Sequence, residues 1–245
     1  MKSSGLRKLL IILFFCCSLP AHAVIKVGTV FFYPPFVLSL NEGFDIELMQ
    51  SLCQGLKEQC QMIPMDFNKL YTSLDKGQID LAIGGIAISP LRKNDYIFSL
   101  PYMLSKGQFL VLQGSGINSM EDLKGAAVGV IKGDPKGGVF YNYLESNFGD
   151  FFQIQTFDDI EDIITALGNK TIKAAFLHHS TAVYWEQNGG NQFQTFGNII
   201  PIGEGYAIMA LPANAALIQR INVLLQGMEK DNAYLNLYKT YFGNN

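Results

Sequence analysis

Short apolar runs alternate with amphipathic stretches after Val24, and this alternation restricts the fold more than any other feature of the chain. The runs IKVGTV, QMIPM and IDLAIGGIAI have the length and composition of buried strands. Between them, GFDIELMQSLCQGLKEQ and FNKLYTSLDKG have helical spacing, and Asp45 and Glu47 fall in a first turn where the helix dipole favours acids. This alternation of strand and helix predicts an α/β sandwich with a mostly parallel sheet.

A second alternating cycle follows the first. SMEDLKG places Asp122 three residues after Ser119, a capping pattern that predicts a short helix. AAVGVI predicts a strand, KGDPKGG a glycine-rich turn and VFYNYLESNF a helix, and QIQTF, DDIEDIITALGN and KAAFL repeat the alternation. AIMAL predicts a last strand before two helices, NAALIQRINVLLQGMEKD and AYLNLYKTYFG. The two cycles predict two similarly built lobes, and the residues alone assign the final strand and helices to neither.

Residues 1–23 have the pattern of a cleaved secretory signal peptide. Lys2, Arg7 and Lys8 precede the apolar run LLIILFFCCSL, which is too short for a stable transmembrane helix, and AHA is a small-x-small cleavage signal. The mature chain is expected to begin near Val24, in the periplasm. Removal of residues 1–23 takes away three of the 18 basic side chains and none of the 21 acidic ones. The mature chain therefore has a net charge of −6. With no Lys/Arg-rich tract left, nucleic acid and anionic membrane surfaces are poor partners.

Cys53 and Cys60 are the two cysteines of the mature sequence. In an exported chain a disulfide is their leading interpretation. A zinc site is a poor competitor because the spacing is wrong and no further mature cysteine is available. If the pair does form a disulfide, the helix that carries Cys53 must end before Cys60 and the chain must fold back.

The stretch SPLRKNDYIFSLPY places a cation where it is electrostatically unfavourable. Ser89 is a good N-cap and Pro90 suits a first helical position, so a short helix is expected with Arg92 in its first turn. The helix dipole disfavours a cation there unless an anion is also bound. The stretch alone leaves an anion site and a solvated surface arginine equally open.

The adjacent residues His178, His179 and Ser180 do not indicate an enzyme. Neighbours on one helix or strand do not converge on a point, and no HExxH motif or paired acidic site accompanies them. We expect instead a helix N-cap at Ser180 and one histidine that lines a pocket. KGDPKGG also lacks the GK[ST] ending of a phosphate-binding loop. The sequence therefore predicts no catalysis, no metal site and no cofactor.

Three segments resemble the periplasmic polar amino-acid-binding protein family (solute-binding protein family 3): GFDIELMQSLC, IDLAIGGIAISPLR and SMEDLKGAAVGVIKG. The likeness runs in order over nearly the whole mature chain, and the cysteine spacing is similar to that of the lysine/arginine/ornithine and histidine binders. It implies the two-lobed type II periplasmic binding protein fold, an α/β fold in which each lobe is a mixed sheet flanked by helices. Lobe 1 would be residues 24–105 plus 206–245 and lobe 2 residues 106–205, with hinges near 104–107 and 203–206.

The resemblance also implies ligand-binding residues. Arg92 corresponds to the arginine that grips a ligand α-carboxylate, Tyr33 and Phe67 to two aromatics that sandwich the ligand side chain, and Gly85 to a carbonyl that accepts from the α-ammonium. A lobe-2 turn would complete carboxylate binding, although a solvated Lys136 is as well supported as a ligating one. The predicted set is Tyr33, Phe67, Gly84, Gly85, Ala87, Arg92, Ile131, Asp134, Pro135, Lys136 and His178.

Three positions depart from the family pattern. Val30 stands where basic amino-acid binders can place an acid, Ala87 replaces a hydroxyl, and His178 replaces the aspartate that neutralises the ligand ammonium. A neutral imidazole can accept one hydrogen bond but has no negative charge. The carboxylate half of the site is retained and the ammonium half is altered. The acids nearest in sequence to pocket segments are Asp66, Asp134 and Glu204.

The resemblance implies a monomeric periplasmic solute-binding protein that delivers a polar amino acid to an inner-membrane ABC permease, most similar to arginine and other basic amino-acid binders. The alternative is a ligand-sensing or interaction protein on the same fold with a non-amino-acid carboxylate ligand. A fused membrane sensor is not expected, because the sequence that follows the signal peptide has no transmembrane segment.

Overall fold

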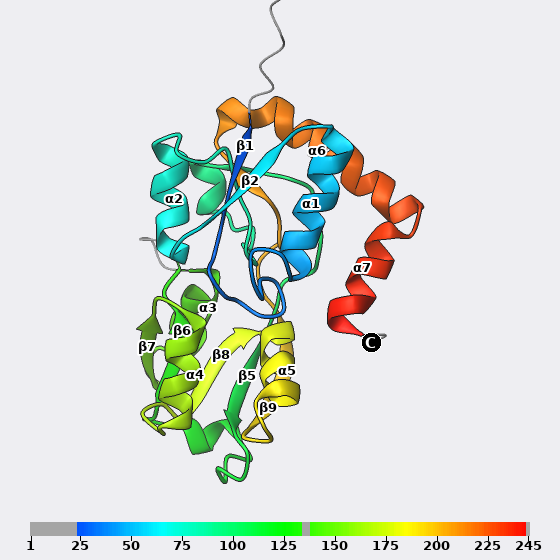
Figure 1. Cartoon of the computed structure of the whole chain (residues 1–245). Helices are drawn as coiled ribbons and strands as arrows, with labels where there is room; N and C mark the ends of the chain where they lie inside the picture. The colour runs from blue at the N-terminus through cyan, green and yellow to red at the C-terminus, as the bar shows by residue number, and fades with distance from the viewer. Residues whose placement is uncertain (1–23, 134–137, 244–245) are drawn as a thin grey trace, which may run out of the picture.

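The computed structural model describes residues 24–133 and 138–243, which form two lobes stacked one above the other (Figure 1). Each lobe is built around one five-stranded sheet. In the first sheet the strand order is β2 (Cys60–Pro64), β1 (Ile25–Thr29), β3 (Leu81–Ala82), β10 (Met209–Ala210) and β4 (Ile97–Phe98). In the second it is β7 (Gln153–Phe157), β6 (Ala127–Ile131), β8 (Ala174–His178), β5 (Lys106–Leu112) and β9 (Phe193–Pro201).

Both sheets are mixed. In the first, β1 pairs in parallel with β2 and β3, whereas β10 runs antiparallel to β3 and β4. In the second, β6 is parallel to β7 and β8, whereas β5 is antiparallel to β8 and β9. The predicted two-lobed α/β fold is confirmed. The prediction of a mostly parallel sheet is wrong, because antiparallel strands enter each sheet where the chain passes from one lobe to the other.

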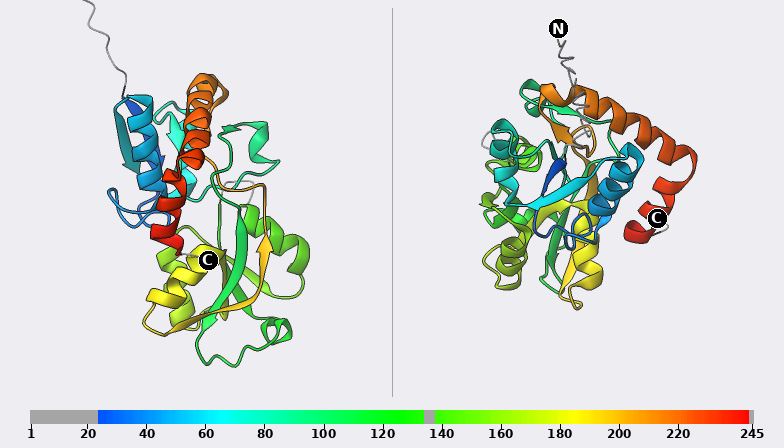
Figure 2. Two further views of the ribbon diagram at one scale, coloured as in Figure 1. Left: turned by 90° about the vertical axis from the view of Figure 1, so that its right-hand side faces the viewer. Right: turned by 45° about the horizontal axis from the view of Figure 1, so that its top comes forward.

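Four helices belong with the first sheet: α1 (Phe44–Leu56), α2 (Phe67–Asp75), α6 (Ala215–Lys230) and α7 (Ala233–Phe242). Both α6 and α7 contact α1, and Figure 2 shows them side by side with it. Because β10 also lies in the first sheet, the last strand and the last two helices pack with the N-terminal half. This is the assignment that the residues alone left open.

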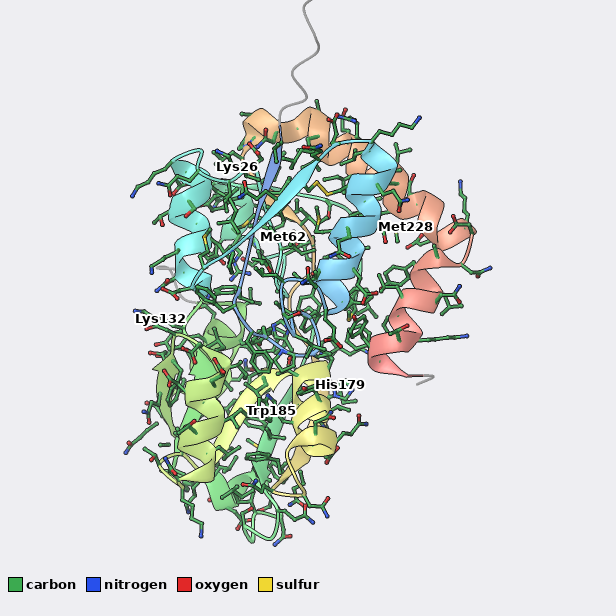
Figure 3. All side chains as sticks on the ribbon, viewed as in Figure 1. Lys26, Met62, Lys132, His179, Trp185 and Met228 are labelled. Atoms are coloured by element: carbon green, nitrogen blue, oxygen red, sulfur yellow. A yellow bond between two sulfur atoms is a disulfide. The ribbon has the colours of Figure 1, made fainter. Side chains whose placement is uncertain are left out.

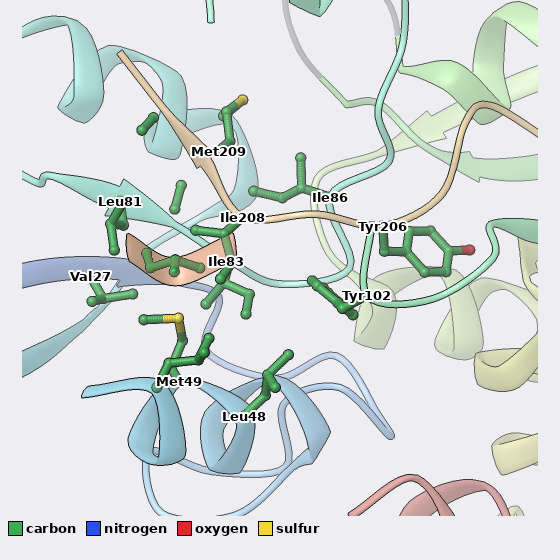
Figure 4. Close-up of a cluster of buried hydrophobic side chains, with 14 of the residues drawn as sticks. Val27, Leu48, Met49, Leu81, Ile83, Ile86, Tyr102, Tyr206, Ile208 and Met209 are labelled. Carbon is green, nitrogen blue, oxygen red and sulfur yellow. The ribbon is translucent and has the colours of Figure 1, made fainter. Parts of the chain in front are cut away.

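The core of the first lobe lies between its sheet and α1 (Figure 4). Val27 and Leu81 from neighbouring strands and Leu48 and Met49 from α1 are all fully buried. Each such side chain stabilises the fold by about 1.5–3 kcal/mol through removal of its surface from water. The helical spacing recognised in the sequence thus places the apolar face of α1 on the sheet.

The second lobe has a core on each face of its sheet. Phe109 and Phe176 lie 4.7 Å apart between ring centroids on one face, which α3 (Val139–Phe148) covers. Leu110 and Leu177, the next residues along β5 and β8, pack on the other face against α4 (Ile160–Gly168), while α5 (His179–Asn188) follows β8 directly. Alternation along each strand therefore divides the apolar residues between the two faces.

Two antiparallel segments connect the lobes. Lys106 pairs with Pro201 at the start of the second sheet, and Met103 bridges to Tyr206 on the side of the first sheet. Tyr206 also bridges to Ala87, so both crossovers and the third apolar run meet at this residue. Its side chain is 1% exposed, and Figure 4 shows it beside the first core. The crossovers hold the site residues of the first lobe against the second.

Several local predictions are corrected. The third apolar run forms only the two-residue strand β3, because the backbone turns away at Gly84 and Gly85, whose φ angles are 148° and 62°. The expected helix after Ser89 is the short 3-10 turn η1 (Arg92–Asn94), in which the hydroxyl of Ser89 accepts from the Arg92 N–H at 3.2 Å. Ser180 is not an N-cap, since α5 begins at His179 directly after β8.

Two further 3-10 turns are η2 (Met120–Leu123), with the expected capping box, and η3 (Pro212–Asn214).

The predicted disulfide is present. Helix α1 ends at Leu56, and Lys57 adopts a left-handed conformation that reverses the chain into β2. Cys53 and Cys60 are bonded, with their Cα atoms 6.1 Å apart. The helix therefore ends before Cys60, as the spacing required.

Candidate functional site

A cleft between the lobes encloses about 910 Å³ of space, including its opening to solvent. It brings together seven of the predicted residues from both lobes: Tyr33, Phe67, Gly85, Ala87, Arg92, Ile131 and His178. Gly84 adjoins Gly85 but does not line the cleft. Asp134, Pro135 and Lys136 lie outside the described residues. In Figure 3, Lys132 and the first residue of α5, His179, are both labelled at the boundary between the lobes.

Arg92 lines the cleft and is only 5% exposed. Its Nη1 donates to the carbonyl of Ala87 at 2.5 Å, and its Cζ lies 6.0 Å from the ring centroid of Phe67 and 5.5 Å from that of Tyr71. The two rings and the carbonyl fix the plane of the guanidinium. This burial contradicts the surface-arginine alternative, and a planar fork of donors fixed at a cleft wall suits a carboxylate.

A buried carboxyl supports the glycine turn from behind. Asp45 accepts a hydrogen bond from the Gly85 N–H at 2.7 Å and another from the Tyr102 hydroxyl at 3.0 Å. Burial raises the pKa of Asp45 to about 7, against the lowering effect of these hydrogen bonds. Asp45 does not line the cleft, so it shapes the turn that ligand would face. The sequence signal for Asp45 was read only as a helix-dipole preference.

His178 sits in a box of aromatic rings. Its imidazole stacks on Tyr206 at 4.4 Å and on Phe140 at 4.5 Å between centroids, and the rings of Tyr33 and Phe36 meet it edge to face at 5.2 and 5.4 Å. Burial, with a further contribution from the Arg92 charge, lowers the pKa of His178 to about 3. The imidazole is therefore neutral near pH 7, and Nδ1 has no hydrogen-bond partner among the described residues.

Val30 and Ala87, the two other positions that depart from the family pattern, both line the cleft. Val30 is 6% exposed and lines the cleft with an apolar side chain, packed beside Gly84. Ala87 offers its carbonyl to Arg92 and has no hydroxyl to offer a ligand. The wall near Arg92 is therefore rich in apolar groups apart from the guanidinium itself and the backbone of the turn.

Acidic side chains gather toward the opening of the same cleft. Asp66, Asp158, Asp159 and Glu161 line it, and the last three are exposed residues at the start of α4 or just before it. Asp66 pairs with Lys69 at 2.5 Å, Asp158 accepts from the Asn68 amide at 3.5 Å across the lobes, and Asp159 caps α4 through the Asp162 N–H. Glu204, which the sequence also suggested, pairs instead with Lys93 and lies outside the cleft lining.

Sequence reasoning missed the residues that surround His178 and the acids of the second lobe. Phe140 was assigned to a helix without a role, and Tyr206 only marked a hinge. The segment DDIEDIITALGN is predicted only as part of the strand and helix alternation, without a role for its acids. Asp158 and Asp159 directly follow β7, a parallel strand of the second sheet, and this position is the signal that could have placed them at the cleft.

Within the described residues, no group of His, Cys, Asp and Glu has the arrangement of a metal site. The same part of the chain contains no helix that is both long enough and apolar enough to cross a membrane.

Comparisons with known proteins agree with this architecture. The model of the bacterial extracellular solute-binding proteins, family 3, matches residues 25–244. The arginine-binding extracellular protein ArtP of Bacillus subtilis is 29% identical, over 88% of this chain and 85% of its own. The L-cystine-binding protein TcyJ of Escherichia coli is 28% identical, over 91% and 84%.

Among solved structures, the periplasmic binding protein of an arginine transport system from Legionella pneumophila superimposes with a TM-score of 0.82 at 35% identity, covering 89% of this chain and 99% of that protein. Fold and sequence match over nearly the full described length. The chain belongs to family 3 of the bacterial extracellular solute-binding proteins.

Proposed function

We propose that this protein is a periplasmic receptor that closes on a small amino-acid-like carboxylate and delivers it to an inner-membrane ABC permease. Relatives that bind arginine or cystine support ligands of this size and polarity. Residues 1–23 would direct export and be removed. The receptor would act as a monomer, since each copy contains both walls of the cleft.

Arg92 carries the proposal. It is a buried cation fixed by the Ala87 carbonyl and by the rings of Phe67 and Tyr71 at the cleft wall. A carboxylate that forms paired hydrogen bonds with such a guanidinium gains about 1.5–3 kcal/mol. Tyr33 and Phe67 would flank the ligand chain, and the backbone of Gly85, which follows Gly84 in the turn, would line the cleft beside the ligand.

Closure would follow from ligand contacts to both lobes. The moving bodies would be residues 24–105 plus 206–245 and residues 106–205, hinged at the paired crossovers near 104–107 and 203–206. Arg92 belongs to the first body and Ile131 to the second. A ligand that touches both favours the closed state by its difference in affinity for the two states.

The test is calorimetric titration of the wild type and Arg92→Ala with arginine, lysine, ornithine, glutamine, cystine and their desamino analogues. For each binder, Arg92→Ala should weaken affinity at least tenfold, about 1.4 kcal/mol, with little change in thermal stability. Arg220→Ala is the matched control, because Arg220 lies on α6 and contacts Glu58 and the Leu56 carbonyl outside the cleft. Equal affinities in the wild type and Arg92→Ala would refute the carboxylate role.

The altered ammonium half of the site favours one alternative: a ligand-sensing or interaction protein with a non-amino-acid carboxylate ligand. Genes for a permease and an ATPase beside this one would support transport. Loss of uptake of the bound compound on deletion of the gene would decide for transport, and unchanged uptake would decide for sensing.

A further inference from the structure

The place that would receive a ligand α-ammonium is filled by a neutral ring. His178 is 6% exposed, and a methyl group at Gly85 would lie 3.0 Å from its Cε1, so the imidazole packs directly on the glycine turn. The imidazole covers one face of the Tyr206 ring and one face of the Phe140 ring, at 4.4 and 4.5 Å between centroids. These two faces are therefore not available to a cation, whose attraction to aromatic rings acts over the ring face.

No described carboxylate compensates at this end of the cleft. Asp45 is the acid nearest to Gly85, but it is fully buried behind the turn and does not line the cleft. Arg92 lies on the same wall and repels an ammonium held close to it. Nδ1 of His178, a buried atom without a hydrogen-bond partner among the described residues, can offer a hydrogen bond but no charge. Among the described residues, no negative charge would replace the hydration that a ligand α-ammonium loses here.

The solvent-exposed part of the cleft lining has the complementary, negative charge. Asp158, Asp159 and Glu161 line the opening from the second lobe and Asp66 lines it from the first. The other side chains that line the cleft are mainly apolar, including Met65, Phe67, Ile131, Val139 and Ile160. A buried cation, an apolar lining and exposed acids together fit a ligand with a carboxylate, a methylene chain and a cation at its far end.

We propose, resting on the function proposed above, that the ligand is an ω-amino or ω-guanidino carboxylate without an α-ammonium. Its carboxylate meets Arg92, its methylene chain lies along the apolar wall, and its terminal cation faces the acids at the opening. 5-Guanidinopentanoate, 6-aminohexanoate and 5-aminopentanoate are the desamino counterparts of arginine, lysine and ornithine and have this chemistry.

The decisive comparison is calorimetric titration of the wild-type protein with each desamino acid and its α-amino parent at pH 7. At least one desamino acid should bind tenfold or more tightly than its parent. If the parents bind as tightly or more tightly, the inference is overturned and the proposed function stands. If neither member of any pair binds, this inference fails, and the proposed function fails with it when the remaining amino acids of the panel also do not bind.

His178→Asp tests why the protein would prefer a desamino acid to its α-amino parent. A carboxylate at position 178 should reverse this preference, so arginine should bind at least tenfold more tightly and 5-guanidinopentanoate more weakly than in the wild type. His178→Asn removes the ring without adding charge, and it should not strengthen arginine binding to the same extent. His179→Asp is the matched control, because it adds the same charge one residue away, at a side chain that bonds Gln108 and does not line the cleft. An unchanged preference in a folded His178→Asp protein contradicts the inference, and the wild-type comparison decides it if that variant does not fold.

Glu161→Gln tests the acidic opening. The variant should bind 6-aminohexanoate about two- to fivefold more weakly, as expected for an exposed charge pair, and hexanoate equally well. Asp162→Asn removes one charge from the neighbouring position, which does not line the cleft, and should leave both affinities unchanged. Equal loss for hexanoate and 6-aminohexanoate in Glu161→Gln would contradict a cation at the opening.

Discussion

Asp45 lies fully buried behind Gly85, and one of its oxygens accepts hydrogen bonds from the Gly85 N–H of the glycine turn and from the Tyr102 hydroxyl. Its other oxygen, Oδ1, has no partner among the described residues. Burial therefore outweighs the two hydrogen bonds and raises the pKa from 3.8 to about 7. Between pH 3.8 and about pH 7, this carboxyl therefore binds more protons in the folded protein than in the unfolded chain. Stability from this group is then full below pH 3.8 and is lost as pH rises to about 7.

Asp45→Asn should remove this pH dependence, since the amide keeps one carbonyl oxygen for Gly85 and Tyr102 and cannot ionise. In urea unfolding between pH 4 and pH 8, the stability of wild type relative to the variant should fall by up to ~4 kcal/mol as pH rises. His178, whose lowered pKa makes stability rise with pH up to 6.5, has the opposite sign but is present in both proteins. Parallel curves for the two proteins would contradict a buried carboxyl that stays protonated near neutrality.

At the scale of single elements, the helices of the first cycle followed from spacing, and the irregular segments did not. The apolar face of α1 and the reversal before Cys60 were predictable from the positions of leucine and cysteine. The run IDLAIGGIAI is predicted to be one long strand, yet only Leu81–Ala82 forms a strand. The Asp45 contact and the positive φ angles at Gly84 and Gly85 turn the backbone out of the sheet. That contact joins residues 40 positions apart, and no local pattern predicts it.

The disulfide joins the end of α1 to the start of β2, where it closes a short loop at the edge of the first sheet. Replacing both cysteines by serine should lower the free energy of unfolding by ~2–3 kcal/mol, mainly because the unfolded chain gains conformational entropy without the disulfide. Urea denaturation of the oxidised wild type and the double variant measures the difference. Reductant should destabilise the wild type and leave the double variant unchanged. Equal stability in the absence of reductant, or two free thiols by mass spectrometry of the exported protein, would contradict this prediction.

At the scale of the whole molecule, the two successive cycles of strands and helices were enough to predict two α/β lobes. The residue contacts across the cleft were not predictable from the sequence. Family likeness located Arg92, Tyr33, Phe67 and His178, and all four line one cleft. The rings around His178 come from three distant segments, near residues 33–36, 140 and 206, which only the folded chain brings together. The acids at the opening had no predicted role, and only the placement of α4 beside the cleft brings them near a ligand.

The most direct test of the arrangement is a crystal structure of the protein with 5-guanidinopentanoate. The account predicts the carboxylate within hydrogen-bond distance of the Arg92 guanidinium, His178 still stacked between Tyr206 and Phe140, and the ligand guanidino group near Asp158, Asp159 or Glu161. A ligand bound in the opposite direction, or bound outside this cleft, would contradict it, as would an imidazole displaced from between the two rings.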